Sequence, residues 1–174
     1  MTDPDRNRRR MARLMTHLTW IVLLAMLTLY FNYYLDSRDN PNGMLALMEG
    51  SAGEVVLERN RAGHYLAPGR INGERVQFLL DTGATTVSVP VRLAQKLGLK
   101  RGRALQSMTA NGVVTVYRTR LDSVTLGGIR MEHVEATINP GMQGTMVLLG
   151  MSFMQHLELV QRGEQLTLRV PEGQ

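Results

Sequence analysis

The most hydrophobic part of the chain lies near its N-terminus. Residues Leu14 to Leu35 form a run of twenty-two positions without Asp, Glu, Lys or Arg. A helix rises about 1.5 Å per residue, so a run of this length spans a hydrocarbon layer of about 30 Å. Trp20 lies near one end and Tyr30 and Tyr34 near the other, as is typical of aromatic side chains at membrane interfaces. We therefore predict a transmembrane helix over residues 14–35.

Charged residues flank this run asymmetrically. Five arginines and two aspartates precede it and carry +3 of the net charge of +5, whereas Asp36 and Asp39 follow it. Basic residues favour the cytoplasmic side, so residues 1–13 are predicted to be cytoplasmic and the remaining domain extracytoplasmic, periplasmic if the source is bacterial. A cleaved signal peptide and a buried soluble helix are the alternatives. The run is longer than a signal peptide's apolar stretch and ends in bulky Tyr33-Tyr34, which favours an uncleaved anchor.

The pattern changes twice beyond the predicted membrane helix. Residues 36–53 are rich in Asn, Pro, Gly, Ser and Asp and enclose a short apolar patch, which indicates a linker with one helical turn. Residues 54–174 then alternate with period two, and Val76, Phe78 and Leu80 share one face of a strand. The folded domain is therefore expected over 54–174.

Short strand-like runs separated by turn signals fill this domain. Asn72-Gly73 predicts a two-residue hairpin turn with positive φ at both positions. Pro90 begins a short helix that Gly98 ends, and residues 151–156 form a second candidate helix. We predict an all-β fold, a small closed β-barrel with one or two short helices. The expected strands are 54–58, 65–71, 75–80, 87–89, 108–110, 113–117, 121–126, 129–138, 146–149 (buried on both sides), 157–160 and 166–170.

Composition excludes several kinds of chemistry. The chain has no cysteine, which removes thiol nucleophiles and Cys-ligated metals, and its four histidines lie far apart in sequence. The glycines match no phosphate-binding loop, so no cofactor or metal is expected. Outside residues 1–13 the net charge is only +2 and aromatic residues are few, which argues against nucleic-acid binding. Ser152 in Gly150-Met151-Ser152 lacks the full nucleophile motif and is interpreted as a helix N-cap.

Asp81 is the strongest candidate for chemistry. It directly follows an apolar strand and begins Asp81-Thr82-Gly83-Ala84, whereas Asp122, the other aspartate beyond residue 39, is expected to be a solvated strand residue. A carboxylate at the end of such a strand needs hydrogen bonds or a shared proton. Gly83 allows a tight turn that brings its N–H near the carboxylate. An Asx-turn is the alternative explanation of the motif.

Four segments in order resemble the retropepsin-like aspartic proteases, in particular their membrane-anchored bacterial branch. Residues 78–84 resemble the catalytic strand and loop, and residues 109–112 resemble the flap. Residues 147–150 resemble the strand behind the catalytic loop, and residues 151–157 the helix that follows it. The resemblance covers 54–174 and implies that Asp81 is catalytic. It further implies loop-supporting residues at Thr82, Gly83 and Ala84, a flap at Ala110, Asn111 and Gly112, and a second supporting segment at Leu148, Leu149 and Gly150.

This resemblance implies a membrane-anchored aspartic endopeptidase that acts on an extended peptide. The chemistry needs two carboxyls about 3 Å apart that share one proton. The chain has a single Asp-Thr-Gly, so the second carboxyl is expected from Asp81 of another copy in a homodimer. Membrane tethering raises the effective concentration of the two copies. Val113, Val147 and Leu149 are candidate walls of the substrate pockets.

Two departures from the retroviral members concern the dimer. Met151 stands where those members usually carry arginine, and Thr85 and Thr86 stand where they usually carry acidic residues. The ion-pair network that stabilises the retroviral dimer is therefore absent. Two other functions stay open: a monomeric, catalytically inactive peptide-binding module on the same fold, and an anchored structural protein without groove chemistry.

Overall fold

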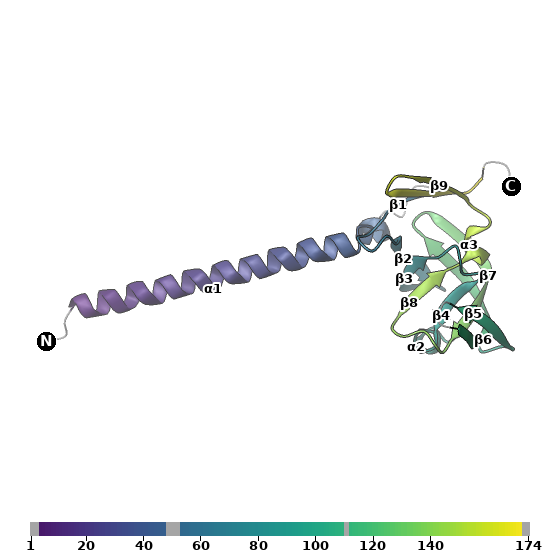
Figure 1. Ribbon diagram of the computed structural model, residues 1–174, viewed down its shortest axis with the longest axis horizontal. Coiled ribbons are helices and arrows are strands. Elements are labelled where there is room, and N and C mark those ends of the chain that lie inside the picture. The colour runs from purple at the N-terminus through teal and green to yellow at the C-terminus, as the bar shows by residue number, and fades with distance from the viewer. Residues whose placement is uncertain (1–3, 48–52, 110–111, 172–174) are drawn as a thin grey trace. The chain divides into compact units, whose positions relative to one another are not determined.

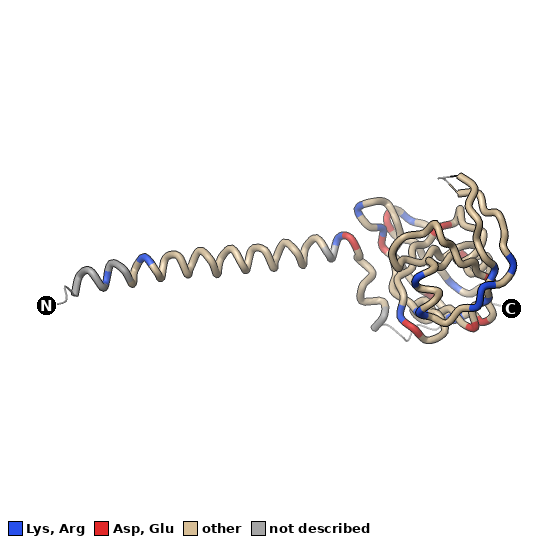
Figure 2. The backbone as a smooth tube through the Cα atoms, turned by 90° about the horizontal axis from the view of Figure 1, so that it is seen from below, with Lys and Arg blue, Asp and Glu red and all other residues tan. Residues whose placement is uncertain are grey.

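The computed structural model describes residues 4–47, 53–109 and 112–171, and it divides into two units, Met1–Arg38 and Asp39–Gln174 (Figure 1). Helix α1 (Pro4–Asp39) makes up the first unit. Its segment Met11–Leu35 is long and apolar enough to cross a membrane, and its large hydrophobic side chains are exposed. Figure 2 shows that the middle of this helix carries no charged residue.

Three threonine hydroxyls within this segment bond to the backbone of their own helix. The hydroxyls of Thr16, Thr19 and Thr28 each donate to the carbonyl oxygen four residues earlier, at 2.8–2.9 Å. A hydroxyl bonded within its own helix can enter an apolar phase without an unmet hydrogen bond. These three hydroxyls therefore add no unmet hydrogen bond to the apolar run.

The second unit is mostly β-structure. Alternating apolar side chains and tight turns give ten strands within the described residues, with two short α-helices and one 3-10 helix between them. The helices are η1 (Gly43–Leu47), α2 (Val91–Lys96) and α3 (Met151–Met154). The strands are β1 (Glu54–Glu58), β2 (Leu66–Ile71), β3 (Glu74–Leu80), β4 (Val87–Pro90), β5 (Ala104–Thr109), β6 (Gly112–Leu126), β7 (Ile129–Asn139), β8 (Met146–Leu149), β9 (Glu158–Arg162) and β10 (Gln165–Arg169).

Seven of these strands form one curled sheet in the order β2-β3-β8-β4-β7-β6-β5. Strand β2 also pairs with β6 through three residue pairs, which brings the sheet back on itself, while β4 meets β8 at the single pair Ser88–Leu148. Gly69 permits the β2–β6 contact, because a Cβ there would lie 2.4 Å from the Thr125 carbonyl oxygen and 2.5 Å from the Phe78 ring. The fold is the all-β barrel type that the pattern predicts.

The core fills the inside of this curl. Phe78, Val87, Leu121, Ile138 and Leu149 are fully buried, and they come from five different strands. Fully burying side chains of this kind stabilises a fold by about 1.5–3 kcal/mol each. The alternation predicted for β3 is confirmed at Val76 and Phe78, which lie in this core.

A separate three-stranded sheet has the order β1-β10-β9. Its inner face contributes Val55, Leu57 and Leu168 to the core. On its exposed side Arg169 Nε donates to the Glu158 carboxylate at 2.7 Å, and this hydrogen bond lowers the pKa of that carboxyl. The β9–β10 ladder pairs Arg162 with Gln165, which leaves Gly163 and Glu164 as the turn.

The turns and helices follow the sequence closely, although the predicted helix 151–156 is shorter, as α3 (Met151–Met154), and the predicted strand 108–110 begins earlier, as β5 (Ala104–Thr109). Asn72 (φ 51°) and Gly73 (φ 86°) both have the positive φ predicted for their turn, and Pro90 precedes α2 as expected. The separate runs 113–117 and 121–126 are one strand, β6, because no Gly or Pro interrupts them. Strand β8 is not buried on both sides, since Met146 is 37% exposed.

The segment before β1 packs on the β-unit through a buried asparagine. Asn42 is 5% exposed, and its Nδ2 donates to the carbonyl oxygens of Glu58 (2.9 Å) and Leu66 (2.7 Å). Its Oδ1 accepts from the Glu58 N–H at 2.7 Å. Leu45, on η1, packs against the core beside Val55 and Gly127. Asn42 thus completes the hydrogen bonding of strands β1 and β2 from outside the sheet.

We expect Asn42→Ala to lower the free energy of unfolding by about 1–3 kcal/mol, because one N–H and two carbonyls in part-buried positions lose their partner. Chemical denaturation of the full chain in detergent, followed by circular dichroism, measures this change. Met44→Ala is the matched control, because Met44 is 73% exposed on the adjacent η1. Equal unfolding midpoints for the two variants would contradict the role given to Asn42.

Candidate active site

Asp81 lies directly after β3 in a turn that its own atoms stabilise. Its backbone N–H donates to the carbonyl oxygen of Leu149 (3.2 Å), and its carbonyl oxygen accepts from the Ala84 N–H (3.2 Å). The Gly83 N–H donates to Asp81 Oδ1 at 2.9 Å. A carboxylate that accepts a backbone N–H is held in one orientation. The loop 81–84 therefore presents the Asp81 carboxylate from the end of a core strand.

Strand β8 runs parallel to β3 and leads into α3 directly behind this loop. The Met151 N–H donates to the Ala84 carbonyl (2.8 Å), and the Ser152 N–H donates to the Thr85 carbonyl (2.9 Å). Gly150 allows this approach, because a Cβ there would lie 2.6 Å from the Ala84 carbonyl oxygen and 2.4 Å from that of Thr86. Any side chain at residue 150 would displace the backbone of the Asp81 loop.

Ser152 connects three elements behind the same loop. Its hydroxyl donates to the Glu135 carbonyl of β7 at 2.7 Å and accepts from the Val87 N–H of β4 at 3.0 Å. The expected N-cap role is wrong: the N-cap of α3 is Gly150, and Ser152 lies inside the helix. The sequence gives no signal for this role, because the two partners are backbone atoms of distant strands.

The structure brings the predicted site residues of two segments together. Asp81, Thr82, Gly83 and Ala84 lie on one loop, against Leu148, Leu149 and Gly150 of the parallel strand. Asp81 is half-buried, whereas Thr82 and Gly83 are exposed. The carboxylate is thus at the surface of a single chain, beside two residues that another molecule can reach.

The predicted flap lies on the β5–β6 hairpin. Ala110 and Asn111 fall outside the described residues, and Gly112 begins β6 with φ 106°, a value that glycine adopts without strain. The Thr109 hydroxyl donates to the Gly112 carbonyl at 2.8 Å across the turn. Near the tip, Met108 and Val113 face each other across the hairpin and are 86% and 63% exposed.

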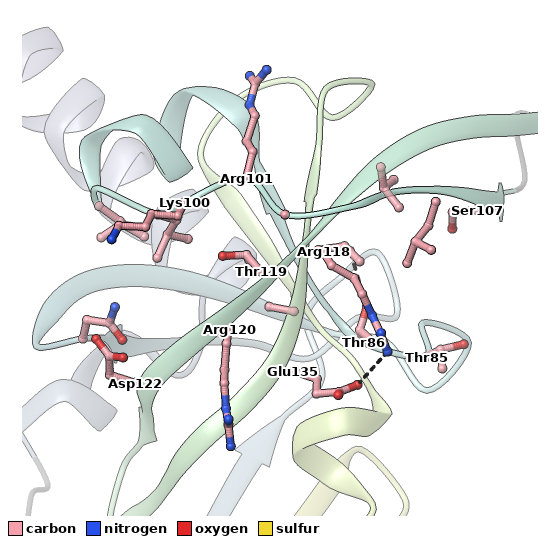
Figure 3. A pocket seen from close by; sticks show the side chains of 18 of the residues that line it. Thr85, Thr86, Lys100, Arg101, Ser107, Arg118, Thr119, Arg120, Asp122 and Glu135 are labelled. Atoms are coloured by element: carbon pink, nitrogen blue, oxygen red, sulfur yellow. Dashed lines mark hydrogen bonds and ion pairs between the residues drawn. The ribbon is translucent and has the colours of Figure 1, made fainter.

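The predicted pocket walls need correction. Val147 and Leu149 are fully buried core residues and cannot line a substrate pocket, because their side chains point away from the surface. A cavity of about 1130 Å³ instead lies between the β5–β6 hairpin, the segment 97–102 and strand β7, and Thr85 and Thr86 line one part of it (Figure 3). Among the described residues no three His, Asp or Glu side chains group as metal ligands would.

Comparison with known proteins agrees with this geometry. A family model described as "gag-polyprotein putative aspartyl protease" matches residues 67–156, which include the Asp81 loop, β8 and α3. The crystal structure of a retropepsin-like aspartic protease from Rickettsia conorii is similar, with a TM-score of 0.57 and 30% identity, over 68% of this chain and 100% of that one. The chain belongs to the retropepsin-like aspartic protease family.

Two uncharacterised bacterial proteins are also similar. One from a Sinorhizobium species is 30% identical over 164 residues, which is 86% of this chain and 70% of that protein. One from Rickettsia prowazekii is 28% identical over 109 residues, 61% of this chain and 46% of that protein. The chain thus spans under half of the second relative's length. The resemblance seen in the sequence motifs is confirmed at the level of family and fold.

We expect Ser152→Ala to lower the free energy of unfolding by about 1–3 kcal/mol, because the Val87 N–H and the Glu135 carbonyl lose their shared partner. Urea unfolding of the full chain in detergent measures this. Gln155→Ala, which removes an exposed side chain just after α3, is the matched control and should change stability by less than about 0.5 kcal/mol. The role of Ser152 would be refuted by unfolding curves that coincide for both variants.

Proposed function

We propose that this protein is a membrane-anchored aspartic endopeptidase that becomes active as a homodimer. The observation that carries the proposal is the placement of Asp81: a half-buried carboxylate oriented by the Gly83 N–H, on a loop seated against Gly150 in a retropepsin-like fold. Extended peptide or protein segments are the proposed substrates. The family membership supports the reaction class, since it is a family of aspartic proteases.

The chemistry requires a second carboxyl beside the first. Two carboxyls about 3 Å apart cannot both ionise, so the pair holds one proton. The ionised carboxylate accepts a proton from a water molecule while the water oxygen attacks the peptide carbonyl carbon. The protonated carboxyl donates its proton to the carbonyl oxygen. The resulting tetrahedral diol then breaks its C–N bond as the nitrogen is protonated, which yields an acid and an amine.

Symmetry supplies the second carboxyl in this proposal. The sequence has a single Asp-Thr-Gly, and the exposed Thr82 and Gly83 leave the Asp81 loop open to a partner. An isologous two-fold contact places the same loop of each copy opposite the other. With Thr85, Thr86 and Met151 in place of charged residues, this contact would rely on backbone and apolar groups.

The β5–β6 hairpin is the proposed flap. An extended substrate between it and the Asp81 loop would pair through its main chain, with side chains alternating toward opposite sides. The hairpin face that carries Leu105, Ser107 and Val116 lines the cavity, so this face can cover a substrate and exclude water. Thr82, Ala84, Leu148 and Leu149 would support the catalytic loop, and Ala110, Asn111 and Gly112 would form the flap tip.

Helix α1 is the proposed anchor, with residues 1–13 in the cytoplasm and the domain on the opposite side. Its exposed apolar run and internally bonded hydroxyls support insertion in lipid. Anchoring confines the chains to a membrane surface, so dimers form at a lower copy number. Residues 36–53 are proposed to connect anchor and domain.

We expect Asp81→Asn to reduce peptide hydrolysis by about 10³-fold or more, because the amide can neither accept the water's proton nor share one with its partner. Hydrolysis of denatured proteins at acidic and neutral pH, with and without a pepstatin-type inhibitor, measures the effect. Glu164→Gln, which removes an exposed carboxylate from the β9–β10 turn, should retain full activity.

Two outcomes would contradict the enzyme proposal. Hydrolysis that persists in Asp81→Asn would assign the chemistry to other residues. Binding of peptides by the wild type without any cleavage, together with a monomer mass in sedimentation, would favour the peptide-binding module. A dimer mass and Asp81-dependent cleavage together support the proposed enzyme.

We expect the full chain to stay in the membrane fraction after alkaline extraction and to keep the mass of the uncleaved polypeptide, because its apolar helix is long enough to span the bilayer. Immunoblotting and mass spectrometry of membranes from expressing cells test both points. Replacing three central leucines with arginine, Leu23, Leu24 and Leu27, should release the protein. A shortened chain in the soluble fraction of wild-type cells would identify a cleaved signal sequence instead.

A further inference from the structure

The cavity described above extends away from the catalytic loop and has an apolar floor. Leu97, Leu99, Leu105 and Val116 line it together with polar and charged residues. Its volume of about 1130 Å³ can hold several residues of an extended chain, but its lining does not include Asp81 itself. Thr85 and Thr86 and the β5–β6 hairpin do line it, so the cavity adjoins the proposed substrate groove, and its chemistry bears on which substrates fit.

A short chain of contacts connects this cavity to the catalytic loop. Thr86 lies five residues after Asp81, and its hydroxyl oxygen is 3.3 Å from the hydroxyl oxygen of Thr137. Thr137 of β7 is the cross-strand partner of Arg118 on β6. All three residues line the cavity, so Arg118 lies at the end of the cavity that adjoins the Asp81 loop.

The charged side chains that line the cavity are mostly basic. The lining contains two acidic residues, Asp122 and Glu135, and four basic ones, which are Lys100, Arg101, Arg118 and Arg120. Arg101 lies over the Tyr117 ring at 5.1 Å, and Arg120 Nε donates to the His133 carbonyl at 3.3 Å. Figure 3 shows the Arg118 side chain extending from β6 toward the carboxylate of Glu135 on β7.

The Arg118–Glu135 pair is weak enough to exchange partners. Its nitrogen–oxygen distance is 3.7 Å, and the two side chains are 61% and 68% exposed. Ion pairs of this length and exposure contribute little, because water screens them. A guanidinium has five N–H donors, so Arg118 can bind a second carboxylate at little cost.

We propose that Arg118 is a specificity-determining residue that selects substrates with an acidic side chain in the part of the peptide that lies along this cavity. The inference rests on the proposed function. The proposed occupant is an extended polypeptide. Its apolar side chains would contact the leucines and Val116 of the lining, and its acidic side chains would meet the basic residues. A carboxylate there can form a bidentate ion pair with Arg118, whereas its amide analogue has no charge and offers a single acceptor oxygen.

Paired peptides test this selection in the full chain in detergent. Each pair consists of an extended peptide with a single Glu and its Gln twin, and the Glu is moved through successive positions on both sides of the cleaved bond. We expect the wild type to prefer the Glu peptide about fivefold at one position, and the preference to decline with salt. Arg118→Gln should bring the ratio of Glu to Gln peptide cleavage to about one. Arg118→Glu should disfavour the Glu peptide and favour a third peptide with Lys at the same position.

Arg130→Gln is the matched control. Arg130 pairs with Glu132 at 3.6 Å, and the two side chains are 59% and 65% exposed, but Arg130 does not line the cavity. This variant should keep the wild-type ratio. An equal loss of preference in both variants would attribute selection to the net charge of the domain and overturn the role of Arg118, as would a Glu preference that survives Arg118→Gln.

A binding measurement separates this inference from the proposed function. Fluorescence anisotropy of the same labelled peptides on full-length Asp81→Asn reports selection without cleavage. If no peptide is cleaved by the wild type but the Glu preference depends on Arg118, the enzyme proposal fails and the selection stands. If cleavage depends on Asp81 but neither binding nor cleavage distinguishes Glu from Gln, the selection fails alone.

Discussion

The close approach of two backbone segments at Gly150 is the constraint on which the site depends. The residue has no Cβ, so β8 can enter α3 within contact distance of the Ala84 and Thr86 carbonyls. The Met151 and Ser152 N–H groups then bond to the Asp81 loop from behind. These bonds are short and made by backbone atoms, so the position of the loop depends little on side-chain rotamers. The carboxylate is oriented before any partner or substrate arrives.

The same arrangement explains why a single chain looks unfinished as an enzyme. The Asp81 backbone bonds to Leu149 and Ala84 and its carboxylate to the Gly83 N–H, while Thr82 and Gly83 themselves are exposed. A loop held this firmly and left open on one side is suited to meeting a rigid partner surface, because little ordering entropy is lost on contact. The preorganised half-site and the proposed two-fold dimer are therefore consistent with each other.

The sequence predicts much of the fold because local signals and burial agree there. Asn72-Gly73 and Pro90 act through their own backbone conformations, so their turn and helix start are readable without the rest of the chain. The missed features are long-range. The hydroxyl of Ser152 bonds to β4 and β7, and the side chain of Asn42 bonds to β1 and β2. In each case the partners are backbone atoms, which carry no residue-specific signal. Val147 and Leu149 were expected as pocket walls but are fully buried, because a continuous apolar run does not identify which of its side chains reach the surface.

Thr85 and Thr86, which distinguish this chain from retroviral members, bear on both the proposed dimer contact and the surroundings of Arg118. Acidic residues at 85 and 86 would hold negative charge beside Arg118, since Thr86 contacts Thr137 and Thr137 lies opposite Arg118. With threonine there, Glu135 is the acidic residue that pairs with Arg118 among the described residues, and that pair is exposed. The threonines that would remove charge from the proposed dimer contact therefore also leave the adjacent groove basic. Weaker subunit contact and attraction for acidic substrates would then have one origin, and an acidic substrate bound to both copies would itself favour the dimer.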